Sequence, residues 1–218
     1  HICFFGLYAP MAAEILSDET NMSFIAGEFE AGLVNLYREI NIEHPPSIIR
    51  RTANLLNKQS FQQPNRGFLP PLSEYAHLQN SYGDKITAGY TEASRGCKHL
   101  CRHCPVVPVY KGRFFIIPKE LVLEDIKKQV AAGAGHISFG DPDFFNGPKH
   151  SIEIVNRVKK NYPHLGYDVT IKIEHLLKHK NLLPVLKDTG CRFITTAVES
   201  FDNDVLVKLE KNHTYDDF

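Results

Sequence analysis

The 218-residue chain is predicted to be an α/β protein, because strand-like and helix-like segments alternate along most of its length. From about Lys85 onward, short runs rich in β-branched residues are each followed by a longer segment with apolar residues at helical spacing. Glycine and proline punctuate the junctions. A strand, a crossover helix and another strand form the repeat that builds a parallel sheet, so βα units around one sheet are expected in this part.

Four such units are predicted in the second half of the chain. The predicted strands are residues 86–91, 136–140, 169–173 and 192–198, and the predicted helices are 118–133, 151–162, 182–189 and 202–211. Pro118 suits the first turn of its helix, and Gly133 suits the C-terminal cap. Asp202 has the side chain of a typical N-cap.

The first forty residues show the same alternation. Residues 1–8 are predicted as a buried strand, 9–17 as a short helix, 22–26 as a second strand, and 27–39 as a helix. Residues 41–84 are predicted to be a connector, because proline pairs interrupt any long element there. A short helix or hairpin is expected within it, at residues 48–58.

The composition is that of an ordinary globular protein. The net charge is zero, 43% of residues are hydrophobic and 23% are charged, so no broad basic surface for nucleic acid is expected. No stretch approaches the roughly 20 apolar residues of a membrane span. Five cysteines, three of them in one triplet, argue against a secreted disulfide framework, and a reducing cytoplasmic setting is predicted.

The triplet is the most specific pattern in the chain. Cys97, Cys101 and Cys104 follow the strand predicted at residues 86–91 with the spacing C-x3-C-x2-C. Iron–sulfur clusters are held by thiolates, usually four, so three thiolates on one loop leave one iron open for chemistry. Basic side chains suited to an anionic cluster crowd this loop: Arg95, Lys98, Arg102, Lys111 and Arg113.

Two other metal sites use similar patterns. A zinc site is an alternative in which His99 or His103 supplies the fourth ligand, but no second Cys/His pair follows at zinc-finger distance. A four-cysteine ferredoxin site requires another nearby cysteine. Cys3 and Cys191 are remote and stand in apolar, strand-like surroundings, so they are predicted to be buried small hydrophobic residues.

The C-x3-C-x2-C loop resembles the signature of the radical S-adenosylmethionine (radical SAM) superfamily. This resemblance implies a [4Fe-4S] cluster held by Cys97, Cys101 and Cys104, with SAM chelating the open iron. Reductive cleavage of SAM would then give methionine and a 5′-deoxyadenosyl radical. His103 stands where the family often has an aromatic residue or histidine near the adenine.

A second resemblance concerns the N-terminal segment. Residues 24–30, with the run Gly-Glu-Phe-Glu, resemble the closing strand–helix unit of the flavodoxin-like, cobalamin-binding domain that precedes some radical SAM barrels. Ser94-Arg95-Gly96 is similar to the lead-in of such members. The family's cobalt-ligating Asp-x-His-x-x-Gly motif is absent from the chain, so cobalamin is a possible cofactor without support here.

These resemblances imply a domain plan and a fold class. Residues 1–40 would be the end of a cobalamin-binding-like domain, 41–84 a linker, and 85–218 the first four units of a six-unit partial (βα) barrel. The chain is therefore expected to be a piece of a longer protein. Residues 27–30 and 90–105 are also similar to a bacterial subgroup named for a Cys- or selenocysteine-Ala-Glu-Pro tail, which would lie past Phe218.

The contacts to SAM are expected at the C-terminal ends of the strands, where parallel barrels place their reactive groups. After the second strand come Gly140, Asp141 and Pro142, at the position of the family's Gly-Gly-Glu region. Asp141 is expected to accept from the methionyl ammonium. The candidates at the third and fourth strand ends, for ribose, ammonium or carboxylate contacts, are Glu174, Glu199 and Ser200.

One further acid, Asp143, and two histidines, His175 and His179, are also candidates. Asp143 is expected to face substrate or solvent, and the sequence does not decide between them. His175 and His179 have the spacing of a metal pair on a helix face, but Lys178 and Lys180 favour an exposed polar turn.

The resulting functional hypothesis is a radical SAM enzyme acting on an unknown small-molecule or peptide substrate. Methyl transfer, methylthiolation and peptide maturation remain open as reactions. The expected protein partner is a reductase, or a flavodoxin or ferredoxin that donates electrons, and neither nucleic acid nor a membrane is expected. The alternative is an iron–sulfur electron-transfer or redox-sensing protein that does not use SAM.

Overall fold

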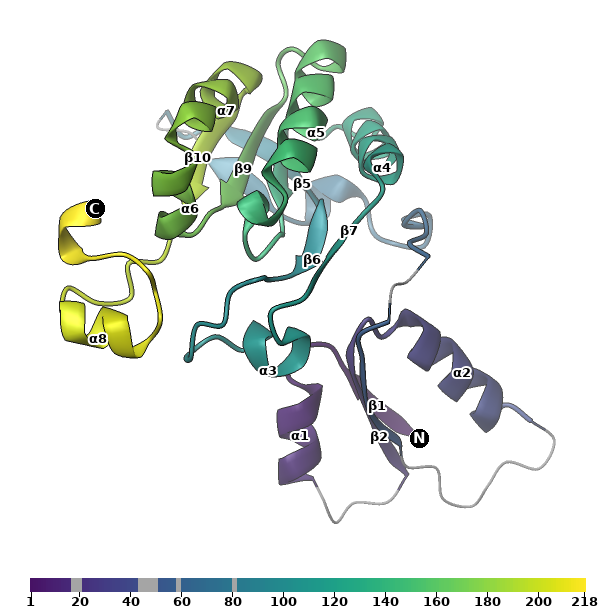
Figure 1. Cartoon of the computed structure of the whole chain (residues 1–218). Coiled ribbons are helices and arrows are strands. Elements are labelled where there is room, and N and C mark those ends of the chain that lie inside the picture. The colour runs from purple at the N-terminus through teal and green to yellow at the C-terminus, as the bar shows by residue number, and fades with distance from the viewer. Residues whose placement is uncertain (17–20, 43–50, 58–59, 80–81) are drawn as a thin grey trace. The chain divides into compact units, whose positions relative to one another are not determined.

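The computed structural model describes residues 1–16, 21–42, 51–57, 60–79 and 82–218, in two compact units (Figure 1). The first unit comprises His1–Ser60 and His99–Arg113, and the second comprises Phe61–Lys98 and Phe114–Phe218. The predicted domain limits at residues 40 and 84 remain predictions.

The first unit contains a three-stranded parallel sheet in the order β1-β2-β3. Its elements are β1 (Ile2–Phe5), α1 (Ala9–Ile15), β2 (Met22–Gly27), α2 (Glu30–Ile40), β3 (Arg51–Leu55) and α3 (Val106–Tyr110). The central strand β2 supplies the core, because Phe24, Ile25 and Ala26 are at most 1% exposed. The predicted strand–helix alternation of the first forty residues is thereby confirmed.

Two predictions for this unit are wrong. The first strand is not buried: Ile2 and Phe5 are 54% and 55% exposed, because β1 is an edge strand with one neighbour. The segment predicted as a helix or hairpin forms β3, which pairs with β2 in parallel. A hairpin requires antiparallel neighbours, so local sequence gave no sign of this long-range pairing. Ser17, residues 48–50 and Lys58, included in these predictions, lie outside the described residues.

The second unit is built on a five-stranded sheet in the order β10-β9-β8-β5-β4. The strands are β4 (His77–Gln79), β5 (Lys85–Thr91), β8 (His136–Phe139), β9 (Gly166–Thr170) and β10 (Cys191–Thr195). All neighbours are parallel except β4, which runs antiparallel to β5. A separate two-stranded ladder joins β6 (Ser94–Gly96) to β7 (Phe114–Ile116).

The helices of this unit follow the strands as the βα repeat requires. They are α4 (Lys119–Ala131), α5 (Pro148–Asn161), α6 (Ile173–Lys178), α7 (Leu183–Thr189) and α8 (Asn203–Lys208). Short 3-10 turns, η1 to η4, cover Leu72–Glu74, Phe144–Asn146, Lys180–Leu182 and Tyr215–Asp217. The parallel strands with intervening helices confirm the predicted α/β class and the four predicted βα units.

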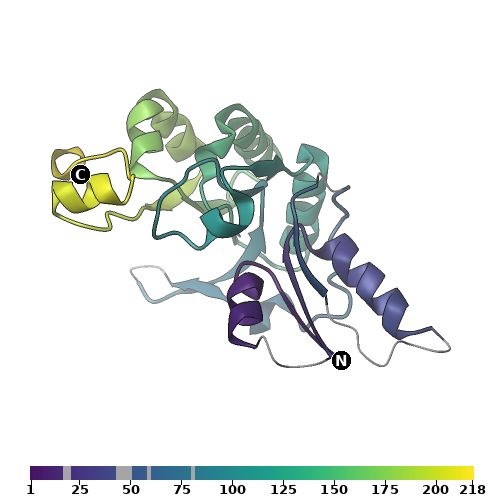
Figure 2. The ribbon, with the colours of Figure 1, turned by 60° about the horizontal axis from the view of Figure 1, so that its bottom comes forward.

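Helices α4, α5 and α7 form a row along one side of the sheet, as the two views show (Figures 1 and 2). The core lies between this row and the strands. Ile137 and Phe139 of β8 face Ile126 and Ile154 of the helices within one cluster, and each is at most 3% exposed. Since successive strand residues alternate between faces, Ser138 belongs to the opposite face.

One strand of the second unit is misplaced in the sequence prediction. Residues 169–173 were expected as the third strand, but β9 is Gly166–Thr170 and Ile173 begins α6. Glycine and aspartate disfavour strands, so the local preferences of Gly166 and Asp168 do not indicate the start of β9. The Asp168 carboxylate lies 2.6 Å from His136 Nε2 and accepts from the Ser138 hydroxyl, so cross-strand hydrogen bonds stabilise it within the sheet.

Two predicted helix ends are confirmed, at Asp202 and Gly133, whereas Pro118 precedes the first turn of α4 as its N-cap. Asp202 is the N-cap of α8, and its carboxylate accepts from the backbone N–H groups of Asp204 and Val205. Gly133 follows α4 with a φ of +97°, a conformation that glycine adopts without strain. Among the described residues, every helix is too short or too polar to cross a membrane.

Candidate cofactor site

The cysteine loop begins where the β6–β7 ladder ends. β6 lies just beyond the first parallel strand, and its last residue, Gly96, has a φ of +77°. Glycine suits this left-handed conformation, which turns the chain into Cys97. The Asn146 side chain contacts both peptide groups beside Cys97: its amide donates to the Gly96 carbonyl, and its oxygen accepts from Lys98 N–H.

All three cysteines of the motif are free thiols. Cys97 belongs to the second unit and is half-buried, whereas Cys101 and Cys104 belong to the first. Cys101 is buried, and its carbonyl accepts from Cys104 N–H at 3.2 Å, so a tight turn separates the two thiols. Three cysteines outside any disulfide, within eight consecutive residues, are suitable donors for an iron–sulfur cluster.

The remaining predicted residue of this loop, His103, is exposed. Cys3 and Cys191 were predicted to be buried, but both are only half-buried, because each lies in the last strand at one edge of its sheet. Desolvation raises the pKa of Cys191 to about 11, with a smaller effect from the Asp168 charge. A thiol that stays protonated at neutral pH is a poor metal ligand.

Residues of the loop after β8 form hydrogen bonds to the end of β5 and the segment that follows it. Gly140 N–H donates to the Thr91 carbonyl, and a side chain at Gly140 would overlap the Tyr90 ring. Asp141 is 2% exposed. Its two carboxylate oxygens accept from Ala93 N–H at 2.8 Å and from the Ser94 hydroxyl at 2.6 Å. Pro142 is exposed.

Burial dominates the electrostatics of Asp141. It raises the pKa of this carboxyl to about 7, although the hydrogen bonds from Ser94 and Ala93 act in the opposite direction. The prediction that Asp141 accepts from the methionyl ammonium stays a prediction. In the structure this carboxylate connects the loop after β8 to the segment between β5 and β6.

Glu174 and Glu199, the acids predicted to contact SAM after the third and fourth strands, each contact one of two consecutive residues near the C-terminus. Lys211 Nζ lies 3.1 Å from Glu199, and the Asn212 amide donates to Glu174 at 3.2 Å. Glu174 lies in the first turn of α6 rather than at a strand end, and it also pairs with Lys172 at 2.9 Å.

Glu199 follows β10 and has a φ of +69°, a conformation that costs a non-glycine residue energy. Ser200 is adjacent, and its hydroxyl accepts from Asp202 N–H. The side chains of Glu174 and Glu199 are 29% and 26% exposed, so both remain accessible to a ligand.

The prediction of an exposed turn at His175 is wrong, and of the two alternatives for Asp143, exposure to solvent is wrong. His175 Nδ1 lies 2.7 Å from the Asp143 carboxylate, and each residue is 1% exposed. The lysines around His175 suggested a solvated turn, but in α6 its own side chain points into the fold while Lys178 is exposed.

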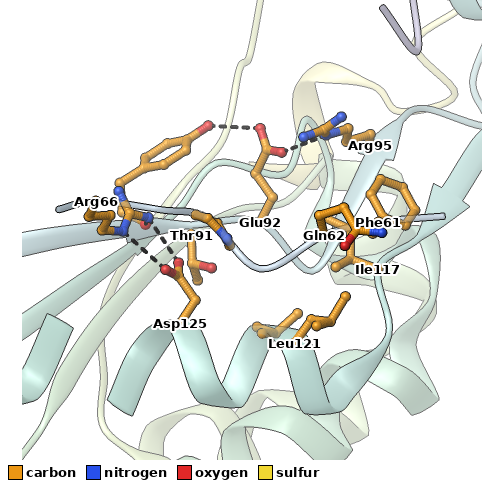
Figure 3. Close-up of a pocket in the computed structure, with 12 residues that line it drawn as sticks. Phe61, Gln62, Arg66, Thr91, Glu92, Arg95, Ile117, Leu121 and Asp125 are labelled. Atoms are coloured by element: carbon orange, nitrogen blue, oxygen red, sulfur yellow. Dashed lines mark hydrogen bonds and ion pairs between the residues drawn. The ribbon is translucent and has the colours of Figure 1, made fainter. Parts of the chain in front are cut away.

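Sequence reasoning missed a pocket of about 330 Å³ beside the end of β5 (Figure 3). Glu92 lies at its edge, where it accepts from the Tyr90 hydroxyl at 3.0 Å and from Arg95 Nε at 2.9 Å. At the other end, Arg66 binds Asp125 of α4 through two parallel bonds of 2.9 and 3.0 Å. The position of Glu92 directly after the first strand of the barrel was the signal available in the sequence.

The Arg66 contacts explain how the predicted linker is held. Its guanidinium also donates to the Tyr90 carbonyl, and Gln129 of α4 donates to both this carbonyl and Asp125. Asp125 is 2% exposed, so its charge is compensated by bidentate pairing. The segment around Arg66 is thereby attached to α4 and β5 within the second unit.

Comparison with known proteins gives a family match and two curated relatives. The Radical SAM superfamily profile matches residues 91–218, more than half of the chain. Hopanoid C-3 methylase of Methylococcus capsulatus is 25% identical over 199 residues, 86% of this chain and 36% of that protein. The tRNA-2-methylthio-N(6)-dimethylallyladenosine synthase of Fusobacterium nucleatum is 25% identical over 190 residues, 80% of this chain and 40% of that protein. The chain thus spans well under half of these relatives.

Two solved structures have a similar fold. TsrM, a radical S-adenosylmethionine methyltransferase of Kitasatospora setae solved with cobalamin and a [4Fe-4S] cluster, gives a TM-score of 0.66 at 17% identity, covering 99% of this chain and 46% of that one. OxsB, a cobalamin-dependent S-adenosylmethionine radical enzyme, gives 0.61 at 14% identity, covering 97% and 33%. These matches confirm the predicted fold class, a mixed α/β protein with a partial barrel of the radical SAM type.

Proposed function

Because this chain belongs to the radical SAM superfamily, we propose that the protein cleaves SAM reductively and directs the resulting radical at a substrate. Cys97, Cys101 and Cys104 are the proposed ligands of the [4Fe-4S] cluster. The observation that carries this proposal is the C-x3-C-x2-C set of free thiols just beyond the first parallel strand of the barrel. Family membership favours this function over a plain electron carrier or redox sensor.

The donor set fits the cluster. Cys97, Cys101 and Cys104 would hold the cluster, and a set of three thiolates would leave one iron available to SAM. When bound, the cluster supplies the electron that cleaves SAM. The contribution of this chain is to hold the thiols, orient SAM and keep water from the radical. Lys98 and Arg102 beside the cysteines carry the positive charge that stabilises thiolates.

For the SAM contacts we favour the acids that follow β9 and β10. Glu199 and Glu174 are accessible, and each is held by a cationic or amide partner. We propose that they accept from ribose hydroxyls or the ammonium group. Ser200 is adjacent to Glu199, and Gly140, Pro142 and His103 remain proposed contacts. Asp141 is buried, and we propose that it acts by holding the loop between β5 and β6.

Among the reactions, we propose methyl transfer before methylthiolation or peptide maturation. One curated relative is a methylase, and TsrM is described as a methyltransferase. Methylthiolation stays the second candidate, because the Fusobacterium relative is a tRNA-2-methylthio-N(6)-dimethylallyladenosine synthase. These relatives extend well beyond the part that this chain covers, so their substrates are not assigned to this protein. The proposed substrate is a small molecule or a peptide.

Cobalamin is a possible cofactor of the whole protein, and its support comes from the solved relatives rather than from a motif of this chain. The solved relatives bind cobalamin, and the first unit has the parallel strands and helices of such a domain. The chain contains no Asp-x-His-x-x-Gly motif, so no residue here is assigned to the cobalt. Radical SAM enzymes need a reductant, and we propose a flavodoxin, ferredoxin or dedicated reductase as the electron donor.

The test is the EPR spectrum of the reconstituted, dithionite-reduced full-length protein, recorded with and without SAM. We expect a [4Fe-4S]⁺ signal that shifts when SAM is added, because SAM binds the open iron. Replacing Cys97, Cys101 and Cys104 together by alanine should abolish it, whereas the matched control Cys191→Ala should leave it unchanged. A cluster signal indifferent to SAM would support the electron carrier, and bound zinc without iron would refute the cluster itself.

A further inference from the structure

We propose that Asn146 is a positioning residue for the cluster: its side chain holds the peptide groups on both sides of Cys97, so that the thiol is oriented before iron binds. This inference rests on the proposed ligation by Cys97. Asn146 lies in η2, after β8, and the chain between Cys97 and Asn146 includes the two helices α3 and α4.

The two hydrogen bonds define the orientation of the amide. The Asn146 oxygen accepts from Lys98 N–H at 3.2 Å, and its nitrogen donates to the Gly96 carbonyl at 3.2 Å. A backbone N–H only donates and a carbonyl only accepts, so just one orientation of the amide satisfies both. Gly96 has a φ of +77°, which brings these two groups toward one side chain.

Asn146 is itself firmly placed. It is 4% exposed, and its N–H donates to the Asp143 carbonyl at 3.0 Å. The Asp143 carboxylate accepts from Phe145 N–H and lies 2.7 Å from His175 Nδ1. The η2 turn is therefore anchored to α6, and the anchor is buried throughout.

This arrangement links three consecutive βα connections of the second unit. The connection after β9 holds the one after β8 through His175, and that connection holds the backbone beside Cys97 through Asn146. A ligand oriented by neighbouring hydrogen bonds loses less conformational freedom when metal binds, and it exchanges more slowly. The expected consequence is a slower loss of iron from the assembled cluster.

The experiment compares the wild-type full-length protein with Asn146→Ala and Asn146→Asp, after cluster reconstitution. Alanine removes both hydrogen bonds. Aspartate has nearly the same shape and keeps an acceptor for Lys98 N–H, but it cannot donate to the Gly96 carbonyl. The control is Asn156→Ala, the same substitution at an exposed position of α5. Iron release to a ferrous chelator, the thermal midpoint of the apo protein and the EPR spectrum are measured for each.

We expect iron release about tenfold faster for Asn146→Ala, with an apo midpoint within a few degrees of wild type. Asn146→Asp should release iron at a rate between those of wild type and Asn146→Ala, or similar to that of Asn146→Ala, and its EPR g values should be altered. The control Asn156→Ala should match wild type in both measurements. Release within twofold of wild type in both Asn146 variants would overturn the inference. So would a large loss of apo stability in both, because the role would then be structural.

The failure of this inference is distinguishable from failure of the proposed function. The SAM-dependent shift in the wild-type EPR spectrum and the effect of Cys97→Ala test the proposed cluster. If Cys97→Ala assembled the same SAM-responsive cluster, the ligation would be refuted, and the positioning role with it. If Cys97 proves essential and the Asn146 variants release iron normally, only the positioning role fails.

Discussion

The connection after β5 and the connection after β8 are neighbours in the second unit, but their charges are used differently. Glu92 and Arg95 remain 27% and 25% exposed at the edge of a pocket, where they pair with each other. Asp141 and Asp143 are buried and bind backbone groups or neighbouring side chains of the fold. The connection that bears the cysteines is therefore held by an acid of its neighbour, Asp141, which contacts Ala93 and Ser94.

This difference shows that the position of an acid near the end of a barrel strand does not by itself identify it as a residue that binds cofactor or substrate. A carboxylate whose oxygens accept from buried N–H and O–H groups stabilises the local fold, and removing it leaves those donors unsatisfied. A half-exposed ion pair contributes much less to stability, but it is accessible to a bound molecule. Three measurements test this contrast.

The largest expected effect is that of Asp141→Ala. It would leave Ala93 N–H and the Ser94 hydroxyl without their acceptor in a site that is at most 4% exposed. We expect the free energy of unfolding to fall by about 2–4 kcal/mol, measured by urea denaturation of the apo protein. The control Asp188→Ala, at an exposed position of α7, should change it by less than about 0.5 kcal/mol. Equal effects of the two variants would refute the structural role of Asp141.

The second prediction concerns pH. Burial raises the pKa of Asp141 to about 7, well above its value in an unfolded chain, so folding favours the protonated carboxyl. The stabilisation from this proton is fully present below about pH 4 and is lost as pH rises through about 7. Relative to Asp141→Asn, the wild type should lose about 2 kcal/mol of unfolding free energy between about pH 5 and pH 7.

Urea denaturation of the two apo proteins across this range provides the measurement. The difference between them should be flat above about pH 8, where Asp141 is ionised in both the folded and the unfolded state. A pH-independent difference would show that the pKa of the buried carboxyl is not raised.

The smallest effect is expected for Glu92→Gln. The ion pair with Arg95 is partly solvated, so the unfolding free energy should change by less than about 1 kcal/mol. Burial, followed by the Glu92 charge, raises the pKa of Tyr90, so the variant should lower that pKa, as measured by ultraviolet difference titration of the phenol. A loss above about 2 kcal/mol would mean that the pocket edge stabilises the fold as much as Asp141 does.

Much of the second unit was predictable because its signals are local. The helix starting at Lys119 has apolar residues at helical spacing and a glycine after its end, and both features act within a few residues. The third parallel strand was not predictable to the same degree. Asp168 is a strand residue only because His136 and Ser138 of β8 approach it, and that contact is made across the sheet.

The candidate site likewise has features that could be predicted from the sequence and features that only the tertiary structure shows. The cysteine spacing and the order of strands and helices are properties of short segments, so the sequence alone determined the family signature, the α/β class and the place of the cysteine loop. Only the tertiary structure decided that Asp141 and His175 are buried, that Glu92 borders a pocket, and that Asn146 contacts the groups beside Cys97. These facts depend on the pairing of residues far apart in the chain, and such pairing is set by the packing of the whole sheet rather than by local preference.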